Sequence, residues 1–173
     1  SLETMALCAG LVGDRTNQQK YEKLATTLKA KLETTFWNAS KQALVHNSIN
    51  GVQSDAVTRY ANMFSVFFNY LTPEKQQAIK HSVLLNDSIL KITTPYMRFY
   101  ELEALCALGE QETVMQEMKA YWGGMLKEGA TSFWEKYNPE ESGTQHLSMY
   151  GRPYGKSLCH AWGASPIYLL GKY

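Results

Sequence analysis

The sequence predicts an all-α protein built from helical hairpins. Apolar residues recur at spacings of three and four along most of the 173-residue chain, which is the period of an amphipathic helix. Helices that are apolar on most faces alternate with more polar ones, the pattern of an inner helix followed by an outer helix. No stretch of more than a few residues is convincing as a β-strand.

The first two predicted helices cover residues 2–11 and 17–36. A loop over residues 37–53 follows, in which Asn-Ser and Asn-Gly pairs are typical of turns. An apolar helix then starts after Ser54 and reaches about residue 68. Its apolar residues cover most faces, so we expect it to be an inner helix.

Two Thr-Pro pairs mark later helix starts, because Thr is a good N-cap and Pro fits the first helical position. They are Thr72-Pro73, which is followed by Glu74 in the first turn, and Thr94-Pro95. The remaining predicted segments are a polar helix over residues 73–84, an apolar helix over 95–108, a polar helix over 110–122, one long irregular stretch over 123–156 and an apolar helix over 158–170.

Three inner–outer hairpins in one chain fit two architectures. One is about half of a closed six-hairpin toroid, the (α/α)6 barrel, and the other is a solenoid of repeats. Solenoid repeats share sequence at a fixed period, and these hairpins share almost none, which favours the toroid. Residues 1–173 are therefore expected to form one all-α domain. The chain begins inside a predicted helix and ends abruptly, so we expect it to be part of a longer protein.

Composition excludes several classes of function. The formal net charge is +1 and Lys and Arg are scattered, so no basic stripe is available for nucleic acid. No apolar run approaches the roughly 20 residues that span a bilayer. No nucleotide-binding or metal-binding motif occurs, so we expect no cofactor and no metal. Cys8, Cys106 and Cys159 lie far apart among apolar neighbours and are interpreted as buried small hydrophobic residues. Secreted, periplasmic and cytoplasmic locations of the parent protein all stay open.

The long irregular stretch is the first place to look for chemistry, because such loops are often functional. It mixes aromatic rings with carboxylates, a combination that suits sugar rings. Glu135 stands out because it follows Phe133 and Trp134 and is preceded by five uncharged residues. Packing among rings should raise the pKa of this carboxyl toward the range useful for proton transfer. The alternative is a glutamate at the loop rim that pairs with Lys136 or Arg152.

Three further residues in and after this stretch bear on the predicted site. His160 is predicted in the first turn of the last helix, directly after the loop, where it can bond a substrate hydroxyl. Its alternative role is a buried histidine that caps a backbone carbonyl. Trp162 fits the protein core better than a sugar-binding platform on sequence alone. His146 has no partner pattern and is expected to be exposed.

Two segments carry a family resemblance. Residues 129–135 read Gly-Ala-Thr-Ser-Phe-Trp-Glu, and residues 157–162 read Ser-Leu-Cys-His-Ala-Trp. These segments resemble Gly-Ala-Thr-Thr-x-Trp-Glu and Ser-Leu-x-His-Ala-Trp of the α-L-rhamnosidases in the large inverting glycoside hydrolase family with an (α/α)6 barrel. Residues 94–105 and the turn at 72–74 are similar in a less specific way. Ser132 replaces the family's second Thr and keeps its hydroxyl.

The resemblance implies a role for each candidate. Glu135 would be the general base, which deprotonates the water that attacks the anomeric carbon. His160 would bond a rhamnose hydroxyl, and Trp134 and Trp162 would help to wall the sugar pocket. The implied partners are a rhamnose-containing carbohydrate and the rest of the parent chain.

An inverting enzyme also needs a general acid, with roughly 6.5–9.5 Å between the two carboxyl groups. The family's segment with Asp, Cys-Pro and Arg-Asp-Glu has no counterpart here, and neither have its accessory β-domains. We therefore expect this chain alone to be inactive. Its uncovered inner helices would favour a homodimer. The alternatives are another six-hairpin glycosidase, a polysaccharide lyase, or a helical scaffold without catalysis.

Overall fold

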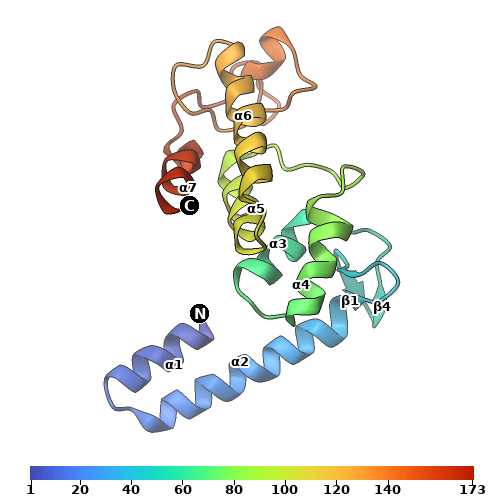
Figure 1. Cartoon of the computed structure of the whole chain (residues 1–173), viewed down its shortest axis with the longest axis vertical. Coiled ribbons are helices and arrows are strands. Elements are labelled where there is room, and N and C mark those ends of the chain that lie inside the picture. The colour runs from blue at the N-terminus through green and yellow to red at the C-terminus, as the bar shows by residue number, and fades with distance from the viewer.

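The computed structural model describes residues 1–173, and its helices follow an open arc with both termini on the concave side (Figure 1). The prediction of an all-α protein is confirmed. The helices are α1 (Leu2–Leu11), α2 (Arg15–Phe36), α3 (Arg59–Phe67), α4 (Pro73–Ile79), α5 (Pro95–Ala107), α6 (Gln111–Lys127) and α7 (Ser165–Lys172). A π-helical turn over Lys80–Leu84 continues α4.

The helices pair into antiparallel hairpins, α1 with α2, α3 with α4 and α5 with α6, while α7 lies beside α5 (Figure 1). Short turns join the two helices of each hairpin, whereas long connections lead from one hairpin to the next. Because successive helices run in opposite directions, the long connections share one rim of the arc. This rim carries the candidate site.

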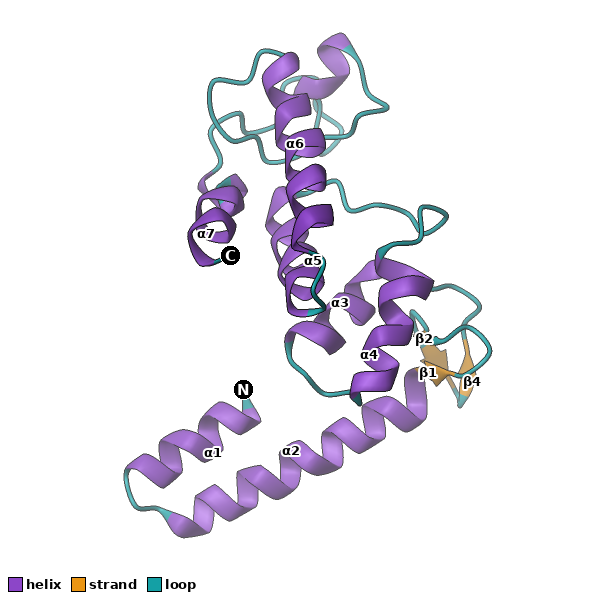
Figure 2. Ribbon diagram, in the orientation of Figure 1, coloured by secondary structure: helices purple, strands orange, loops and turns teal.

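The few strands lie in the first long connection and form two small hairpins (Figure 2). Strand β1 (Trp37–Asn38) pairs with β2 (Ala43–Leu44), and β3 (Ser48–Ile49) pairs with β4 (Val52–Gln53), both antiparallel. They fall within the loop predicted over residues 37–53 and leave the fold class unchanged.

The hydrophobic core lies between α3, α4, α5 and α6. Met63 on α3, Ile79 on α4, Leu102 on α5 and Met125 on α6 are all fully buried. Away from this core, apolar side chains remain exposed on α1 and α7, among them Leu7 and Leu11. None of the helices combines the length and the apolar character that crossing a bilayer requires.

Three helix boundaries and two cysteines differ from prediction. Helix α3 begins at Arg59 instead of directly after Ser54. Helix α6 continues to Lys127 instead of ending at Trp122, because Gly123 and Gly124 remain helical. The last α-helix begins at Ser165 rather than Leu158, and residues 161–163 form only a 3₁₀ turn. Pro166 opens this helix, as Pro commonly does in a first turn. Cys106 is buried as expected, whereas Cys8 and Cys159 are exposed.

Gly124 is required by close packing of α6 against the long loop. A Cβ atom at this position would lie 2.4 Å from Tyr137 Oη and 2.6 Å from two ring carbons. Tyr137 is buried, and its ring packs against Tyr121 and His146, so it has little room to move. The absence of a side chain at residue 124 thus lets the loop seat on the helix.

Gly124→Ala is expected to destabilise the domain by about 1–3 kcal/mol through this overlap. Gly123→Ala is the matched control, since a Cβ there meets nothing within 4 Å. It should stabilise the helix by about 0.5–1 kcal/mol, because alanine loses less entropy than glycine on folding. Urea unfolding of both variants measures the difference in the free energy of unfolding. Equal values would show that the Tyr137 side chain moves aside without cost.

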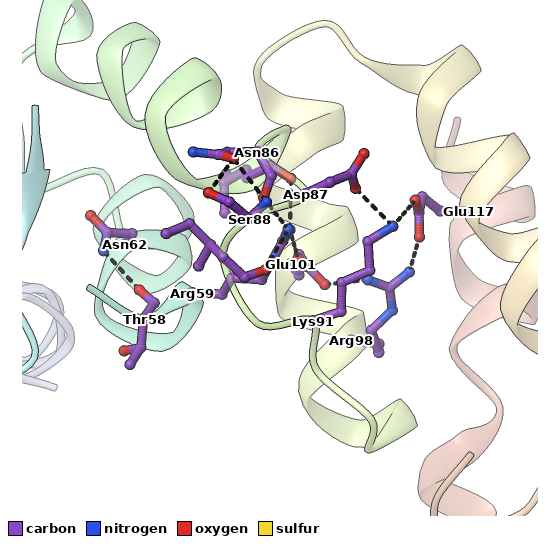
Figure 3. A network of polar contacts seen from close by, with 12 residues as sticks. Thr58, Arg59, Asn62, Asn86, Asp87, Ser88, Lys91, Arg98, Glu101 and Glu117 are labelled. Carbon is purple, nitrogen blue, oxygen red and sulfur yellow. Dashed lines mark hydrogen bonds and ion pairs between the residues drawn. The ribbon is translucent and has the colours of Figure 1, made fainter. Parts of the chain in front are cut away.

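A buried charged network ties the second long connection to the core (Figure 3). Arg59 on α3 donates to the carbonyl oxygens of Leu84 at 2.7 Å, Asn86 at 2.9 Å and Ile89 at 3.2 Å. Its Nη1 also contacts Glu101 Oε1 on α5 at 2.6 Å. The guanidinium thereby bonds to carbonyls at the end of the π-helical turn and in the loop that follows it.

The network continues from Glu101 toward α6. Arg98 Nη1 contacts Glu101 Oε2 at 2.6 Å, and Arg98 Nη2 pairs with Glu117. Lys91 reaches both Glu117 at 3.3 Å and Asp87 at 3.1 Å. The ion pairs therefore join the loop that leads into α5 to helices α5 and α6 (Figure 3).

Candidate active site

Backbone hydrogen bonds close the long loop at its base. The N–H of Glu135 donates to Ser157 O at 3.0 Å, and the N–H of His160 donates to Phe133 O at 2.8 Å. The Ser132 hydroxyl also donates to Leu158 O. Segments 132–135 and 157–160, which are distant in sequence, thus lie side by side. This pairing brings the two main candidates, Glu135 and His160, to the same place.

Two donors hold the half-buried carboxylate of Glu135. The Tyr150 hydroxyl donates to Oε1 at 2.8 Å, and the N–H of Ser157 donates to Oε2 at 3.1 Å. Tyr150 is presented by a tight turn in which Met149 and Arg152 pair. Tyr150 and Gly151 both have positive φ angles, 54° and 72°, as a type I′ turn requires. A non-glycine residue in this region is uncommon and marks a constrained position.

The electrostatics of Glu135 differ from the expectation. Its pKa lies below the ordinary value because the Ser157 N–H stabilises the carboxylate, and this outweighs the upward effect of burial. The Tyr150 hydroxyl and the charges of His160 and Lys156 lower the same pKa further. The predicted upward shift is therefore wrong. Hydrogen bonds that stabilise the ionised carboxylate lower its pKa more than the neighbouring rings raise it, because the rings do not enclose the carboxylate.

The loop-rim alternative for Glu135 is also not what the structure shows. Lys136 pairs with Glu141 instead of Glu135, and the side chain that donates a hydrogen bond to Glu135 is that of Tyr150. Arg152 makes no ion pair with Glu135; it contributes instead to the turn that presents Tyr150. The carboxylate is thus held by neutral donors, which leaves it available as a proton acceptor.

His160 and Trp162 form an aromatic edge beside Glu135. His160 is half-buried and precedes the 3₁₀ turn, so its predicted position in the first turn of an α-helix is wrong. Its ring meets Trp162 edge-on, with centroids 5.7 Å apart. Trp162 also packs on Tyr96 at the start of α5, at 4.9 Å. Trp162 is 65% exposed, which corrects the interpretation of this residue as part of the core.

Trp134 lies beneath the candidate site. It is 5% exposed and packs against His146, with centroids 6.0 Å apart. His146 is buried as well and stacks on Tyr137 at 5.5 Å, so its predicted exposure is wrong. No local pattern predicts this burial, because the ring partners of His146 come from elsewhere in the loop. Trp134 therefore supports Glu135 from below, and its role in walling a sugar pocket stays a prediction.

A large cavity lies away from these residues. It measures about 540 Å³ and is lined by the loop at 87–93, by α6 and by residues 137–140. Glu135, His160 and Trp162 do not line it. Glu135 and His160 are half-buried and Trp162 is exposed. No group of three or more His, Cys, Asp or Glu residues gathers in a way that would hold a metal ion.

Comparison with known proteins decides what kind of domain carries this arrangement. Residues 1–173 match the family described as the bacterial alpha-L-rhamnosidase 6 hairpin glycosidase domain. The chain belongs to this family. No curated protein matches the sequence closely enough to add a relative.

Solved rhamnosidases share the fold of this domain. The GH78 family rhamnosidase of Bacillus sp. GL1 is 23% identical, with a TM-score of 0.81 over 99% of this chain. The rhamnosidase from Klebsiella oxytoca with rhamnose bound is 25% identical, with a TM-score of 0.77 over 98% of this chain. This chain covers 18% and 31% of those two chains. The prediction of helical hairpins that form part of a six-hairpin toroid is confirmed, and the solenoid alternative is set aside.

Two residues of this rhamnosidase-family domain act on Glu135 although the sequence did not predict them at the site. Tyr150 donates directly to its carboxylate, and the charge of the buried Lys156 contributes to lowering its pKa. The pair Tyr150-Gly151 between Met149 and Arg152 is a usable turn signal, since a two-residue turn of this type favours Gly at its second position. Lys156 carries no such signal, because nothing in its local sequence distinguishes it from an exposed lysine.

Proposed function

We propose that this chain is the C-terminal half of a catalytic (α/α)6 barrel that hydrolyses terminal α-L-rhamnosides with inversion, and that Glu135 is its general base. The carboxylate of Glu135, held by Tyr150 and Ser157 beside His160, carries the proposal. Membership of the α-L-rhamnosidase family and the names of the two solved relatives support the substrate class.

The proposed reaction follows from this geometry. The Glu135 carboxylate accepts a proton from water as the water oxygen bonds to the anomeric carbon. The glycosidic C–O bond breaks on the opposite face of the sugar, and a second carboxyl group protonates the leaving oxygen. The two donors on Glu135 keep its carboxylate ionised and oriented. His160 bonds a sugar hydroxyl, and the exposed ring of Trp162 forms a wall of the pocket.

The second carboxyl is proposed to come from the rest of the parent protein. This chain covers less than a third of each solved rhamnosidase compared above. Among its candidate residues, Glu135 and His160 are half-buried and Trp162 is exposed, as one wall of a larger site would be. The chain alone is therefore expected to lack rhamnosidase activity, although it supplies the base.

The stereochemistry of the first product tests the proposal. The intact parent protein is given an aryl α-L-rhamnoside, and proton NMR follows the anomer that forms before mutarotation. We expect the β-anomer first, and no hydrolysis by the chain alone. A first-formed α-anomer would contradict the inverting role of Glu135. An inert rhamnoside would remove the substrate assignment, and an unsaturated product from a polysaccharide would favour a lyase instead.

Tyr150→Phe is expected to move the acidic side of the pH profile upward. Glu135 acts as a base only when ionised, so the rate falls as pH decreases through its pKa. The Tyr150 hydroxyl is one of the groups that lower this pKa. Its loss should raise the pKa and shift the acidic limb of kcat/KM upward by about 0.5 pH unit. Tyr154→Phe is the matched control, since Tyr154 is an exposed tyrosine on the same loop. Identical profiles for both variants would show that the Tyr150 bond has no part in setting this limb.

A further inference from the structure

The exposed indole of Trp162 needs neighbouring side chains to hold it in one orientation. Its backbone is well supported, because Trp122 Nε1 donates to Gly163 O at 2.8 Å. Gly163 also packs closely on the loop, since a Cβ atom there would lie 2.7 Å from Phe133 Cβ. The side chain of Trp162, by contrast, is 65% exposed on a turn of three residues. An exposed side chain exchanges between rotamers unless its neighbours restrict it.

Two rings pack against this indole, and they come from different parts of the chain. His160 meets it edge-on, with centroids 5.7 Å apart, but His160 lies only two residues away on the same segment. Tyr96 lies on the inner helix α5 and stacks on the indole, with centroids 4.9 Å apart and an angle of 33° between the ring planes. Tyr96 is therefore the ring that ties Trp162 to the helices of the barrel.

The start of α5 gives Tyr96 a fixed support. Pro95, the first residue of the helix, is fully buried. Thr93 O, just before the helix, accepts from the Tyr121 hydroxyl at 2.7 Å and from the Tyr137 N–H at 2.9 Å. The segment that enters α5 is thereby bonded both to α6 and to the long loop.

The ring of Tyr96 is itself restricted by its own helix. Tyr100, one turn further along α5, meets Tyr96 edge-on, with centroids 5.7 Å apart and an angle of 86° between the planes. Their hydroxyl oxygens lie 3.5 Å apart. Aromatic pairs at such separations attract one another beyond the burial of their area. Tyr96 thus contacts one ring on its own helix and the indole of Trp162 beyond it.

We propose that Tyr96 is a positioning residue for the substrate, whose ring holds the indole of Trp162 beside His160 before the sugar binds. Tyr96 acts through Trp162 and takes no part in the proton transfers. A wall that is already ordered binds the sugar more tightly, because binding does not have to immobilise a rotating side chain. The inference rests on the proposed function, in which Trp162 is a wall of the sugar pocket.

The test compares kcat and KM for an aryl α-L-rhamnoside, measured on the intact parent protein. Tyr96→Ala removes the ring and is expected to raise KM by about 3- to 10-fold. The value of kcat should stay within about twofold of wild type, because the wall contacts the sugar equally in the ground state and the transition state. Tyr96→Phe keeps the ring and should restore the wild-type KM.

Tyr168→Ala is the matched control. Tyr168 is an exposed tyrosine that also packs edge-on against a ring of α5, that of Phe99, with centroids 5.4 Å apart. Its packing does not involve Trp162, so its removal should leave KM unchanged. An equal rise of KM in Tyr168→Ala and Tyr96→Ala would show a general effect of loosening α5 and would overturn the proposal.

A double variant shows whether Tyr96 acts through Trp162. Trp162→Ala should raise KM by itself, and adding Tyr96→Ala to it should raise KM no further, because effects that pass through one shared contact do not add. Additive effects of the two substitutions would overturn the proposal. So would an unchanged KM in Tyr96→Ala, or a rise in Tyr96→Phe as large as that in Tyr96→Ala.

Thermal unfolding checks that the variants are folded, and Tyr96→Leu replaces the alanine variant if that one does not fold. Failure of the proposed function has a separate signature. The parent protein would then leave the rhamnoside intact, or Trp162→Ala would keep the wild-type KM, and either result removes the wall on which the inference rests. If Trp162→Ala raises KM and Tyr96→Ala does not, the proposed function stands and the role of Tyr96 is refuted.

Discussion

Glu135→Gln in the intact parent protein is expected to lower kcat for an aryl α-L-rhamnoside by about 10²–10⁴-fold. Glutamine keeps the size of the side chain, and its amide oxygen can still accept from the Ser157 N–H while its NH2 group donates to the Tyr150 hydroxyl oxygen, so the loop should stay closed. It cannot take a proton from water. The change in KM should be small, because the lost interaction is one that strengthens only in the transition state.

Glu140→Gln supplies the control for this measurement. Glu140 lies on the same loop, is exposed, and forms no ion pair in the chain. It should keep wild-type kcat. Full activity of Glu135→Gln with unchanged unfolding temperature would make Glu135 a structural loop residue, and the base would have to be sought outside this chain.

Glu101→Gln should produce the largest loss of stability. Glu101 is fully buried and accepts from both Arg59 and Arg98 at 2.6 Å. The isosteric amide removes the charge between two buried guanidinium groups and turns an N–H toward one of them. Removing one partner from a buried ion pair typically costs about 3–5 kcal/mol, because the remaining charge stays buried without compensation.

Calorimetry of the intact protein measures this effect. The unfolding transition of the domain should shift down by about 10 °C, as expected for a domain of this size. Glu112→Gln, at an exposed position on α6, should shift it by less than about 1–2 °C. Similar shifts in the two variants would mean that the network in Figure 3 contributes little net stability.

Most of the fold could be predicted from local sequence. Thr72-Pro73 and Thr94-Pro95 open α4 and α5 where expected, because capping and proline geometry act within a few residues. The end of α6 could not be predicted this way. Two consecutive glycines usually weaken a helix, but Gly124 is kept helical by Tyr137, which contacts it from a distant part of the loop.

The proximity of Glu135 and His160 could be predicted from the sequence, whereas the environment of each could not. Glu135 and His160 lie on neighbouring bonded segments, as a shared site requires. The direction of the pKa shift at Glu135 was wrong, because it depends on Ser157, whose N–H reaches the carboxylate only after the loop closes. The burial of His146 and Lys156 likewise depends on contacts across the loop. Such contacts leave no periodicity in the sequence.

The hydrogen bonds at the base of the long loop make the position of the candidate residues independent of the exposed turn in the same loop. Bonds between residues 132–135 and 157–160 fix the relative position of Glu135 and His160 without help from the exposed turn around residues 138–145. Homologous domains can therefore lengthen, shorten or replace that turn while the spacing of the two side chains is inherited unchanged. That turn can thus change in length or sequence without altering the arrangement of the two proposed site residues.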